Sequence, residues 1–206
     1  MDRLFPMFMK LQGRKCLVVG AGRVGEPKIS GLADTGACVR VVALQASAAV
    51  RQWAGCGKIQ LELREYRAGD LQDIFLAVVA TSSRALNAAV YGDAQQRGVL
   101  CNVVDDPPHC DFFYPAVVQR GDLQIAVSTA GQSPSLAQKL RQQLERQFGP
   151  GYASWVAELG KIRKEVLASN LQPERKRDLL HSLASREAFQ SALAEHNQSN
   201  GRKETT

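Results

Sequence analysis

Short apolar segments alternate with longer segments of mixed polarity up to residue 105. The apolar segments are rich in β-branched residues and end in glycine or polar turns, which is typical of strands: 16–19, 38–43, 59–63, 74–80 and 99–104. The segments between them have the composition of helices: 24–32, 46–54 and 84–96. This alternation predicts an α/β fold with a doubly wound, parallel, Rossmann-like sheet.

Two of the predicted strands differ in pattern. Segment 74–80 (IFLAVVA) is continuously apolar, as expected for a strand that is buried on both faces. Segment 59–63 (IQLEL) alternates apolar and polar residues, which predicts a strand at a sheet edge. Helix 24–32 is expected to end at Gly36, because glycine is common just beyond a helix end.

The pattern changes after residue 105. Segment 105–111 is rich in proline and interrupts any regular element. Segments 113–118 and 123–128 then flank 119–122 (QRGD), which predicts a β-hairpin. Ser133-Pro134 is a typical helix start, with serine as the N-cap and proline in the first helical position. That helix carries one apolar stripe, formed by Leu136, Leu140, Leu144 and Phe148.

The chain is therefore expected to have four parts. A Rossmann domain covers 1–112, and a small strand-plus-helix region covers 113–149. A helical C-terminal domain covers 150–197, because residues 152 to 196 are helical in pattern. The polar tail 198–206 is expected to be disordered.

Composition narrows the class of protein. The 206 residues are 45% hydrophobic and 22% charged, as in ordinary globular proteins. No apolar run is long enough to cross a membrane, and the N-terminus lacks the apolar core and cleavage site of a signal peptide. Five cysteines without a C-x-x-C spacing favour neither a disulfide framework nor a zinc site. We therefore expect a cytoplasmic protein with no membrane contact and no metal site.

The net charge of +6 favours an anionic partner. The basic residues form no dense tract, and the aromatic residues, 6% of the chain, do not interleave with them as they do in single-strand binders. A polyanionic small molecule is therefore a better candidate than a nucleic acid.

The segment around the first predicted strand carries the strongest functional motif. Gly20, Gly22 and Gly25 form G-x-G-x-x-G directly after a strand and before a helix. In that context the first glycine allows a tight turn, the second lets the backbone approach a pyrophosphate, and the third lets the helix pack closely on the sheet. The start of the helix then offers N–H groups to the phosphates. The motif predicts nucleotide binding.

The acidic residue that usually binds the ribose hydroxyls after the second strand is missing. No Asp or Glu occurs between Asp34 and Glu62. Gln45 or Ser47 could partly substitute for it, and Arg40 and Arg51 are candidate partners of a 2′-phosphate. These residues alone therefore do not decide between the two dinucleotides.

Candidate acid–base residues follow the last parallel strand. Asp105 and Asp106 lie where that strand delivers side chains into the cleft, and repulsion between adjacent carboxylates suits a proton acceptor. The alternative is turn capping before the prolines. His109 is a weaker candidate, and a surface loop position is the more economical interpretation of it.

The loop before the helix at Ser133 is a second candidate site. Its sequence, STAGQSP from residue 128 to 134, ends at a helix N-terminus, where a carboxylate binds favourably. A simple capped connection explains the same residues equally well.

Taken together, these residues resemble a known family. The segments FPMF-x-x-L-x-G-R-K-C-L-V-V-G-A-G-x-V, CNVVDDP and FFYPAVVQRGDLQIAVSTAGQSPSLA are similar to the dehydrogenase/chelatase module of siroheme synthase. The resemblance extends from about Phe5 to Leu140. It implies NAD-dependent oxidation of precorrin-2 to sirohydrochlorin, and in many members insertion of ferrous iron to give siroheme.

The resemblance also implies roles for individual residues. Asp105, in N-V-V-D, is the expected general acid/base, and the serine-rich loop is the expected contact with the tetrapyrrole substrate through Ser128, Thr129, Gly131 and Ser133. The expected NAD contacts are the glycine loop and the end of the second strand: Gly20, Gly22, Arg23, Val24, Gly25, Leu44 and Gln45. Family members are homodimers built through the region that corresponds to 113–149. The non-enzymatic alternative is an NAD-sensing regulatory module, in which Asp105 has no special role.

Overall fold

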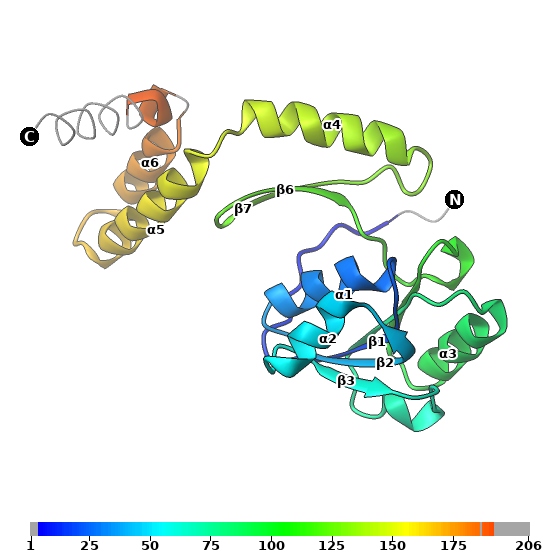
Figure 1. The fold of residues 1–206 in the computed structure, drawn as a ribbon. Helices are drawn as coiled ribbons and strands as arrows, with labels where there is room; N and C mark the ends of the chain where they lie inside the picture. The colour runs from blue at the N-terminus through cyan, green and yellow to red at the C-terminus, as the bar shows by residue number, and fades with distance from the viewer. Residues whose placement is uncertain (1–3, 186, 192–206) are drawn as a thin grey trace, which may run out of the picture. The chain divides into compact units, whose positions relative to one another are not determined.

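The computed structural model describes residues 4–185 and 187–191. The chain divides into two compact units, with the boundary between Tyr114 and Pro115 (Figure 1). The predicted tail 198–206 and the last residues of the predicted helical domain, 192–197, lie outside the described residues. The division into the four parts expected from the sequence stays a prediction.

The first unit contains a parallel sheet with the strand order β3-β2-β1-β4-β5. Its strands are β1 (Lys15–Ala21), β2 (Cys38–Ala46), β3 (Gln60–Leu63), β4 (Leu76–Val79) and β5 (Leu100–Val103). Its helices are α1 (Gly25–Asp34), α2 (Ala48–Gly55) and α3 (Arg84–Gln96), with 3₁₀ turns at Ala68–Leu71 and Pro107–His109. The predicted α/β Rossmann-like fold is confirmed, since β1 pairs in parallel with both β2 and β4.

Each face of the sheet has its own apolar core, because successive side chains of a strand point to opposite faces. Cys16 and Val18 of β1 pack on the face covered by α1 and α2, together with Ile29 and Val50. Leu17 and Val19 pack on the opposite face, together with residues of α3, β4 and β5: Val90, Ala94, Ala77, Val79, Cys101 and Val103. The fully buried pattern of β4 confirms the strand predicted from its apolar run, and β3 lies at the sheet edge, as predicted.

Local capping fixes where the helices begin and end. The hydroxyl of Ser83 accepts a hydrogen bond from the backbone N–H of Leu86, so α3 begins at Arg84, as predicted. Helix α1 ends at the predicted glycine: Gly36 has a φ of 77° and donates its N–H to the carbonyl of Ala33.

The part of the second unit that the structure describes begins with a hairpin and is helical after it. Strands β6 (Ala116–Arg120) and β7 (Leu123–Val127) are antiparallel and are followed by α4 (Pro134–Gln147), α5 (Tyr152–Ala168) and α6 (Pro173–Leu183). The predicted hairpin is confirmed, but its loop is shorter than predicted. Arg120 pairs with Leu123, so Gly121 and Asp122 alone form the loop. Gly121 has a φ of 57°, which suits the first central position of a type II′ turn.

Helix α4 begins as predicted. The hydroxyl of Ser133 accepts from the N–H of Leu136, and Pro134 occupies the first turn. Its apolar stripe is less buried than a core stripe: Leu136 is 48% exposed and Leu140 is 36% exposed. The stripe is therefore partly open to solvent.

Two further observations concern the chain as a whole. Among residues 4–185 and 187–191, no helix has the combination of length and apolar character needed to cross a bilayer. All five cysteines are free thiols: Cys16 and Cys101 are buried, Cys38 and Cys56 are exposed, and Cys110 is intermediate.

The buried thiols give a test of the sheet. Burial raises the pKa of Cys16 to about 11 and that of Cys101 to about 12, so both remain protonated at pH 8. Alkylating reagents attack the thiolate, and we expect iodoacetamide to label Cys38 and Cys56 of the native protein but not Cys16 or Cys101. Peptide mass spectrometry before and after denaturation measures this. Labelling of Cys16 in the native state at the rate of Cys38 would contradict the described core.

Candidate functional site

A pocket of about 720 Å³ lies at the carboxyl ends of the parallel strands. Each of the five strands contributes to its wall, either by its last residues or by those that follow it: Val19 to Val24, Val42 to Gln45, Arg64 to Tyr66, Ala80 to Ser83, and Val104 with Asp105. This edge of an open α/β sheet is where ligands bind, and the volume is in the range of small-molecule sites. Six of the seven residues predicted to contact the cofactor line this one pocket, and so does Asp105; the seventh, Gly25, is buried and does not line it.

The glycine loop needs its first glycine for two reasons. Gly20 has a φ of 102°, a conformation that residues with a side chain rarely adopt. A Cβ atom at this position would also lie 2.3 Å from the carbonyl oxygen of Ala80, at the end of β4. The chain therefore turns from β1 towards α1 directly against the neighbouring strand.

The other two glycines of the motif play different parts. A Cβ atom at Gly25 would lie 2.3 Å from the carbonyl oxygen of Gly20, so the first turn of α1 packs closely on the loop. A Cβ atom at Gly22 would meet no protein atom within 4 Å. The open side of the loop faces the pocket, and this cradle of backbone fits a dinucleotide pyrophosphate at the start of α1.

The end of β2 forms the next part of the wall. Leu44, which is 70% exposed, and Gln45 both line the pocket. Ser47 does not: its hydroxyl donates to the carboxylate of Glu26 at 2.5 Å and accepts from the N–H of Val50 as the N-cap of α2. Of the two residues suggested as substitutes for the missing acid, only Gln45 therefore reaches the pocket.

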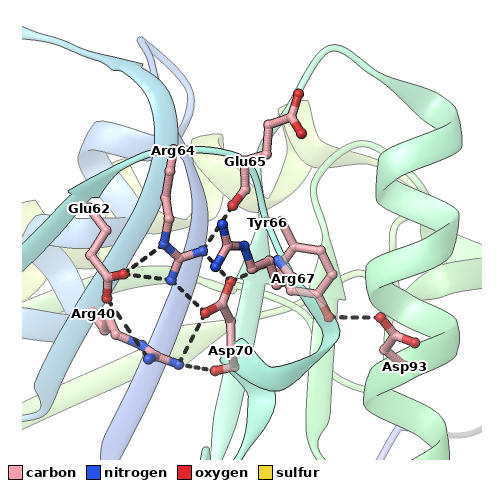
Figure 2. Close-up of polar contacts among 8 residues, drawn as sticks. All are labelled: Arg40, Glu62, Arg64, Glu65, Tyr66, Arg67, Asp70 and Asp93. Carbon is pink, nitrogen blue, oxygen red and sulfur yellow. Dashed lines mark hydrogen bonds and ion pairs between the residues drawn. The ribbon is translucent and has the colours of Figure 1, made fainter.

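The arginines suggested as partners of a 2′-phosphate lie elsewhere. Arg40 donates to the backbone carbonyl of Asp70, and the Nε of Arg51 donates to the carbonyl of Ala46 at 3.2 Å. Neither arginine lines the pocket. Arg64, which the sequence did not single out, does line it, and it is held by the carboxylates of Glu62 and Asp70 (Figure 2).

Asp105 lies just beyond β5 and also lines the pocket. Its φ of 61° is in the left-handed region, which Asp enters more readily than most residues but still at a cost of about 1–3 kcal/mol. The neighbouring backbone maintains this conformation, since the N–H of Asp106 donates to the carbonyl of Val103 at 3.2 Å. Asp105 is therefore exposed in a constrained turn at the pocket wall.

A lysine that the sequence did not single out belongs to the same end of the first unit. Lys28, on α1, lies over the ring of Tyr114, with 3.8 Å from its Nζ to the ring centre. Burial lowers the pKa of Lys28, and the negative charge of Asp105 opposes that effect. Asp105 thus has a half-buried cation in its surroundings. The position of Lys28 in the first turns after the glycine loop is the only sequence signal for it.

Three polar residues next to Asp105 stabilise the local structure: Asn102, Asp106 and His109. Asp106 binds the Nδ1 of His109 at 2.8 Å, and the ring of His109 packs edge-on against Tyr91. His109 is therefore anchored in the loop instead of being a free surface residue. The side-chain amide of Asn102 donates to the carbonyl of Phe112 at 2.8 Å, which ties the proline-rich segment to the sheet.

The serine-rich loop belongs to the second unit. Its hydroxyl groups stabilise the loop itself: Ser128 accepts from the N–H of Ala130, and Thr129 accepts from the N–H of Ser133, both at 3.1 Å. Ala130 and Gly131 have φ values of 51° and 79°. The capped connection is thus present, and the predicted substrate contacts at Ser128, Thr129, Gly131 and Ser133 stay a prediction.

No cluster of three or more metal-ligating side chains of the kind His, Cys, Asp or Glu occurs within the part of the chain that the structure describes.

Comparison with family models gives two matches. Residues 7–116 match a family described as putative NAD(P)-binding, and residues 120–147 match one described as sirohaem biosynthesis protein central. The two matches divide the chain between the strand-rich unit with the pocket and the hairpin with α4.

Curated relatives and a solved structure extend these matches. Siroheme synthase 1 of Yersinia enterocolitica is 42% identical over 81% of this chain and 35% of its own length, and siroheme synthase of Methylococcus capsulatus is 38% identical over 86% and 37%. The chain thus spans about a third of the length of these relatives. The structure of SirC, precorrin-2 dehydrogenase, covers 98% of this chain and 100% of its own, with a TM-score of 0.80 and 26% identity.

Two glycine variants separate the roles of the loop. Gly20→Ala places a side chain in a strained conformation and against Ala80, so we expect the free energy of unfolding to fall by about 1–3 kcal/mol. Gly22→Ala meets no protein atom, so we expect stability within about 0.5 kcal/mol of the wild type but a weaker affinity for NAD⁺. Urea denaturation and isothermal titration measure the two effects. Equal loss of stability in both variants would contradict the assigned roles.

Proposed function

The chain belongs to the family of siroheme synthase N-terminal modules, and on that premise we propose that it oxidises precorrin-2 to sirohydrochlorin with NAD⁺. One observation carries the proposal. The glycine loop and Asp105 both line a single pocket at the carboxyl edge of the sheet. That arrangement supports a cofactor site and an acid–base group in reach of one substrate.

Different residues of the pocket wall bind different parts of the cofactor. Gly20, Gly22, Arg23 and Val24 line the pocket and present backbone N–H groups to the pyrophosphate, and Gly25 lets the first turn of α1 pack closely on the loop. Leu44 and Gln45 face the adenosine ribose, because they lie near the end of β2, next to the loop. When bound, NAD⁺ supplies the hydride acceptor for the oxidation.

Asp105 acts as the proton acceptor. Oxidation of the macrocycle removes a hydride and a proton, and the proton needs a base at the pocket wall. Asp105 is exposed there, and Lys28 on α1 brings a positive charge into its surroundings.

The serine-rich loop binds carboxylates of the tetrapyrrole. Ser128, Thr129 and Ser133 use their hydroxyl oxygens as acceptors within the loop, which leaves the hydroxyl hydrogens for donation to a substrate. Gly131 and the start of α4 add backbone N–H groups. The net charge of +6 also favours an anionic substrate.

The proposal includes a cytoplasmic homodimer. Five free cysteines suit a reducing compartment. The hairpin and α4, within the predicted dimerisation region 113–149, expose the apolar side chains of Val117, Leu136 and Leu140. Burial of these side chains against a second copy would remove apolar surface from water.

Insertion of ferrous iron into sirohydrochlorin is the second step of the proposal, and here the metal is a substrate. Asp105 would accept the protons that the pyrrole nitrogens lose when the metal enters. The alternative function is an NAD-sensing regulatory module, which binds NAD⁺ without turnover.

Replacement of Asp105 tests the mechanism. We expect Asp105→Asn to lower the rate of precorrin-2 oxidation by about 100- to 10,000-fold, since the variant lacks a base but accepts the same left-handed backbone. The affinity for NAD⁺ should change by less than about twofold, because Asp105 is not one of the expected NAD contacts. NADH absorbance and the sirohydrochlorin spectrum follow the reaction. Asp106→Asn is the matched control and should retain most of the activity.

The outcomes separate the candidate functions. NADH production by the wild type supports the dehydrogenase, and its absence together with tight NAD⁺ binding supports the regulatory module. An unimpaired Asp105→Asn variant would remove Asp105 from the mechanism. Adding Fe²⁺ to supplied sirohydrochlorin measures metal insertion separately from oxidation.

The homodimer predicts a mass of about 45 kDa, twice the chain mass of 22.5 kDa, in light scattering. Leu136→Glu places a charge on the exposed stripe of α4 and should shift the mass towards that of the monomer. Leu179→Glu, at an exposed position of α6 outside the predicted dimerisation region, is the control. A monomeric wild type would contradict the homodimer.

A further inference from the structure

Arg64 lies beside the place where a Rossmann fold binds the adenosine ribose. Ala43 of β2 pairs with Leu63 of β3, so Leu44 and Arg64 are the next residues of two adjacent strands. Both line the pocket. An arginine near this position is the usual partner of the 2′-phosphate that distinguishes NADP⁺ from NAD⁺.

The guanidinium of Arg64 has no hydrogen-bond donor left for such a phosphate. An arginine has five N–H donors, and all of those of Arg64 are used. Its Nε and Nη2 donate to one carboxylate oxygen of Glu62 at 2.8 and 2.5 Å, and Nη2 and Nη1 donate to the two carboxylate oxygens of Asp70 at 2.7 and 2.8 Å. The fifth hydrogen bond runs from Nη1 to the backbone carbonyl of Glu65 at 2.8 Å (Figure 2).

The acceptors of Arg64 are themselves held in place. Asp70 is only 5% exposed, and its carboxylate also accepts from the backbone N–H of Arg67 at 2.8 Å. Hydrogen bonds from Arg64 lower the pKa of the Asp70 carboxyl, which keeps it ionised at neutral pH. Tyr66 anchors the same segment to α3 by donating to Asp93 at 2.9 Å, as Figure 2 shows.

The network is also electrically balanced. Arg40 lies 3.9 Å from carboxylate oxygens of both Glu62 and Asp70, so two arginines face two carboxylates. A phosphate that approaches Arg64 would meet no net positive charge and would have to displace a carboxylate. The other arginine at the pocket wall, Arg23, belongs to the glycine loop, where the pyrophosphate is expected.

We propose that Glu62 and Asp70 keep Arg64 from binding a 2′-phosphate, so that this network makes the pocket select NAD⁺ over NADP⁺. The inference rests on the proposed function in so far as a dinucleotide occupies the pocket. Selectivity then comes from Arg64, whose N–H donors are all in use. It does not come from an acidic residue at the end of β2, because this chain has none there. Leu44 and Gln45 contribute no charge of either sign to the ribose site.

Binding measurements on the purified chain test the inference without a tetrapyrrole substrate. We expect the wild type to bind NAD⁺ at least about tenfold more tightly than NADP⁺ in isothermal titration. Glu62→Ala frees two N–H donors of Arg64 and should tighten NADP⁺ binding by about tenfold or more, since a hydrogen bond to a charged group contributes that much. The affinity for NAD⁺ should stay within about threefold, less than one such hydrogen bond.

Glu65→Ala is the matched control. It removes one negative charge from the pocket wall but leaves the backbone carbonyl that accepts from Arg64, so NADP⁺ binding should tighten by less than about threefold. In the double variant Glu62→Ala/Arg64→Ala the gain should disappear. Glu62→Gln, which keeps the shape of the side chain, should show a smaller gain in the same direction, and circular dichroism checks that each variant is folded.

Three results would overturn the inference. The wild type could bind both dinucleotides equally, Glu62→Ala could behave like Glu65→Ala, or the gain could persist without Arg64. A wild type that binds neither dinucleotide would overturn the proposed function itself, together with the inference that rests on it.

Discussion

A methyl group at Gly20 would lie 2.3 Å from the carbonyl oxygen of Ala80, and one at Gly25 would lie equally close to the carbonyl oxygen of Gly20. Backbone therefore packs directly on backbone where β1, β4 and α1 meet. This close approach brings the start of α1 to the carboxyl edge of the sheet, between the two strands at which the strand order reverses. The pocket depends on it, because a wider turn would move the N–H groups of α1 away from the open side of the loop at Gly22.

Much of the fold follows from local patterns. Apolar runs predict strands, and a capping residue such as Ser133 predicts a helix start, because both signals act within a few residues of the chain. Local patterns predict the structure less well where the pairing of strands decides the length of a loop. The loop of the hairpin shortens to Gly121 and Asp122 because the strands pair up to Arg120 and Leu123. Similarly, periodicity identifies the apolar stripe of α4 but does not tell how much of it is open to solvent.

Some residues of the site can also be predicted from local sequence, and others cannot. The glycine loop and Asp105 can be recognised from the sequence because each is marked by neighbouring residues, a motif in one case and a strand end before prolines in the other. Arg64 and Lys28 cannot, because their importance arises from contacts with residues distant in the chain. Arg40 illustrates the limit: its position in β2 suggests a phosphate contact, whereas its side chain donates to the backbone of Asp70, thirty residues further on. Only the register of β2 and β3 shows which arginine reaches the pocket.

The positive φ of Asp105 connects the fold to the chemistry. A non-glycine residue in this conformation costs free energy that the surrounding structure must offset, and such residues gather at functional sites. In this chain the constrained turn and the glycine loop line the same pocket. The cavity wall thus combines a loop that suits a phosphate with an exposed carboxylate.

A crystal structure of the chain with NAD⁺ tests this central claim most directly. We expect the pyrophosphate against Gly20 to Gly25, the adenosine ribose beside Leu44, and the nicotinamide ring on the side of the pocket formed by Ala80 and Asp105. A cofactor bound in the reverse direction, with its adenine next to Asp105, or bound outside this pocket, would contradict the claim.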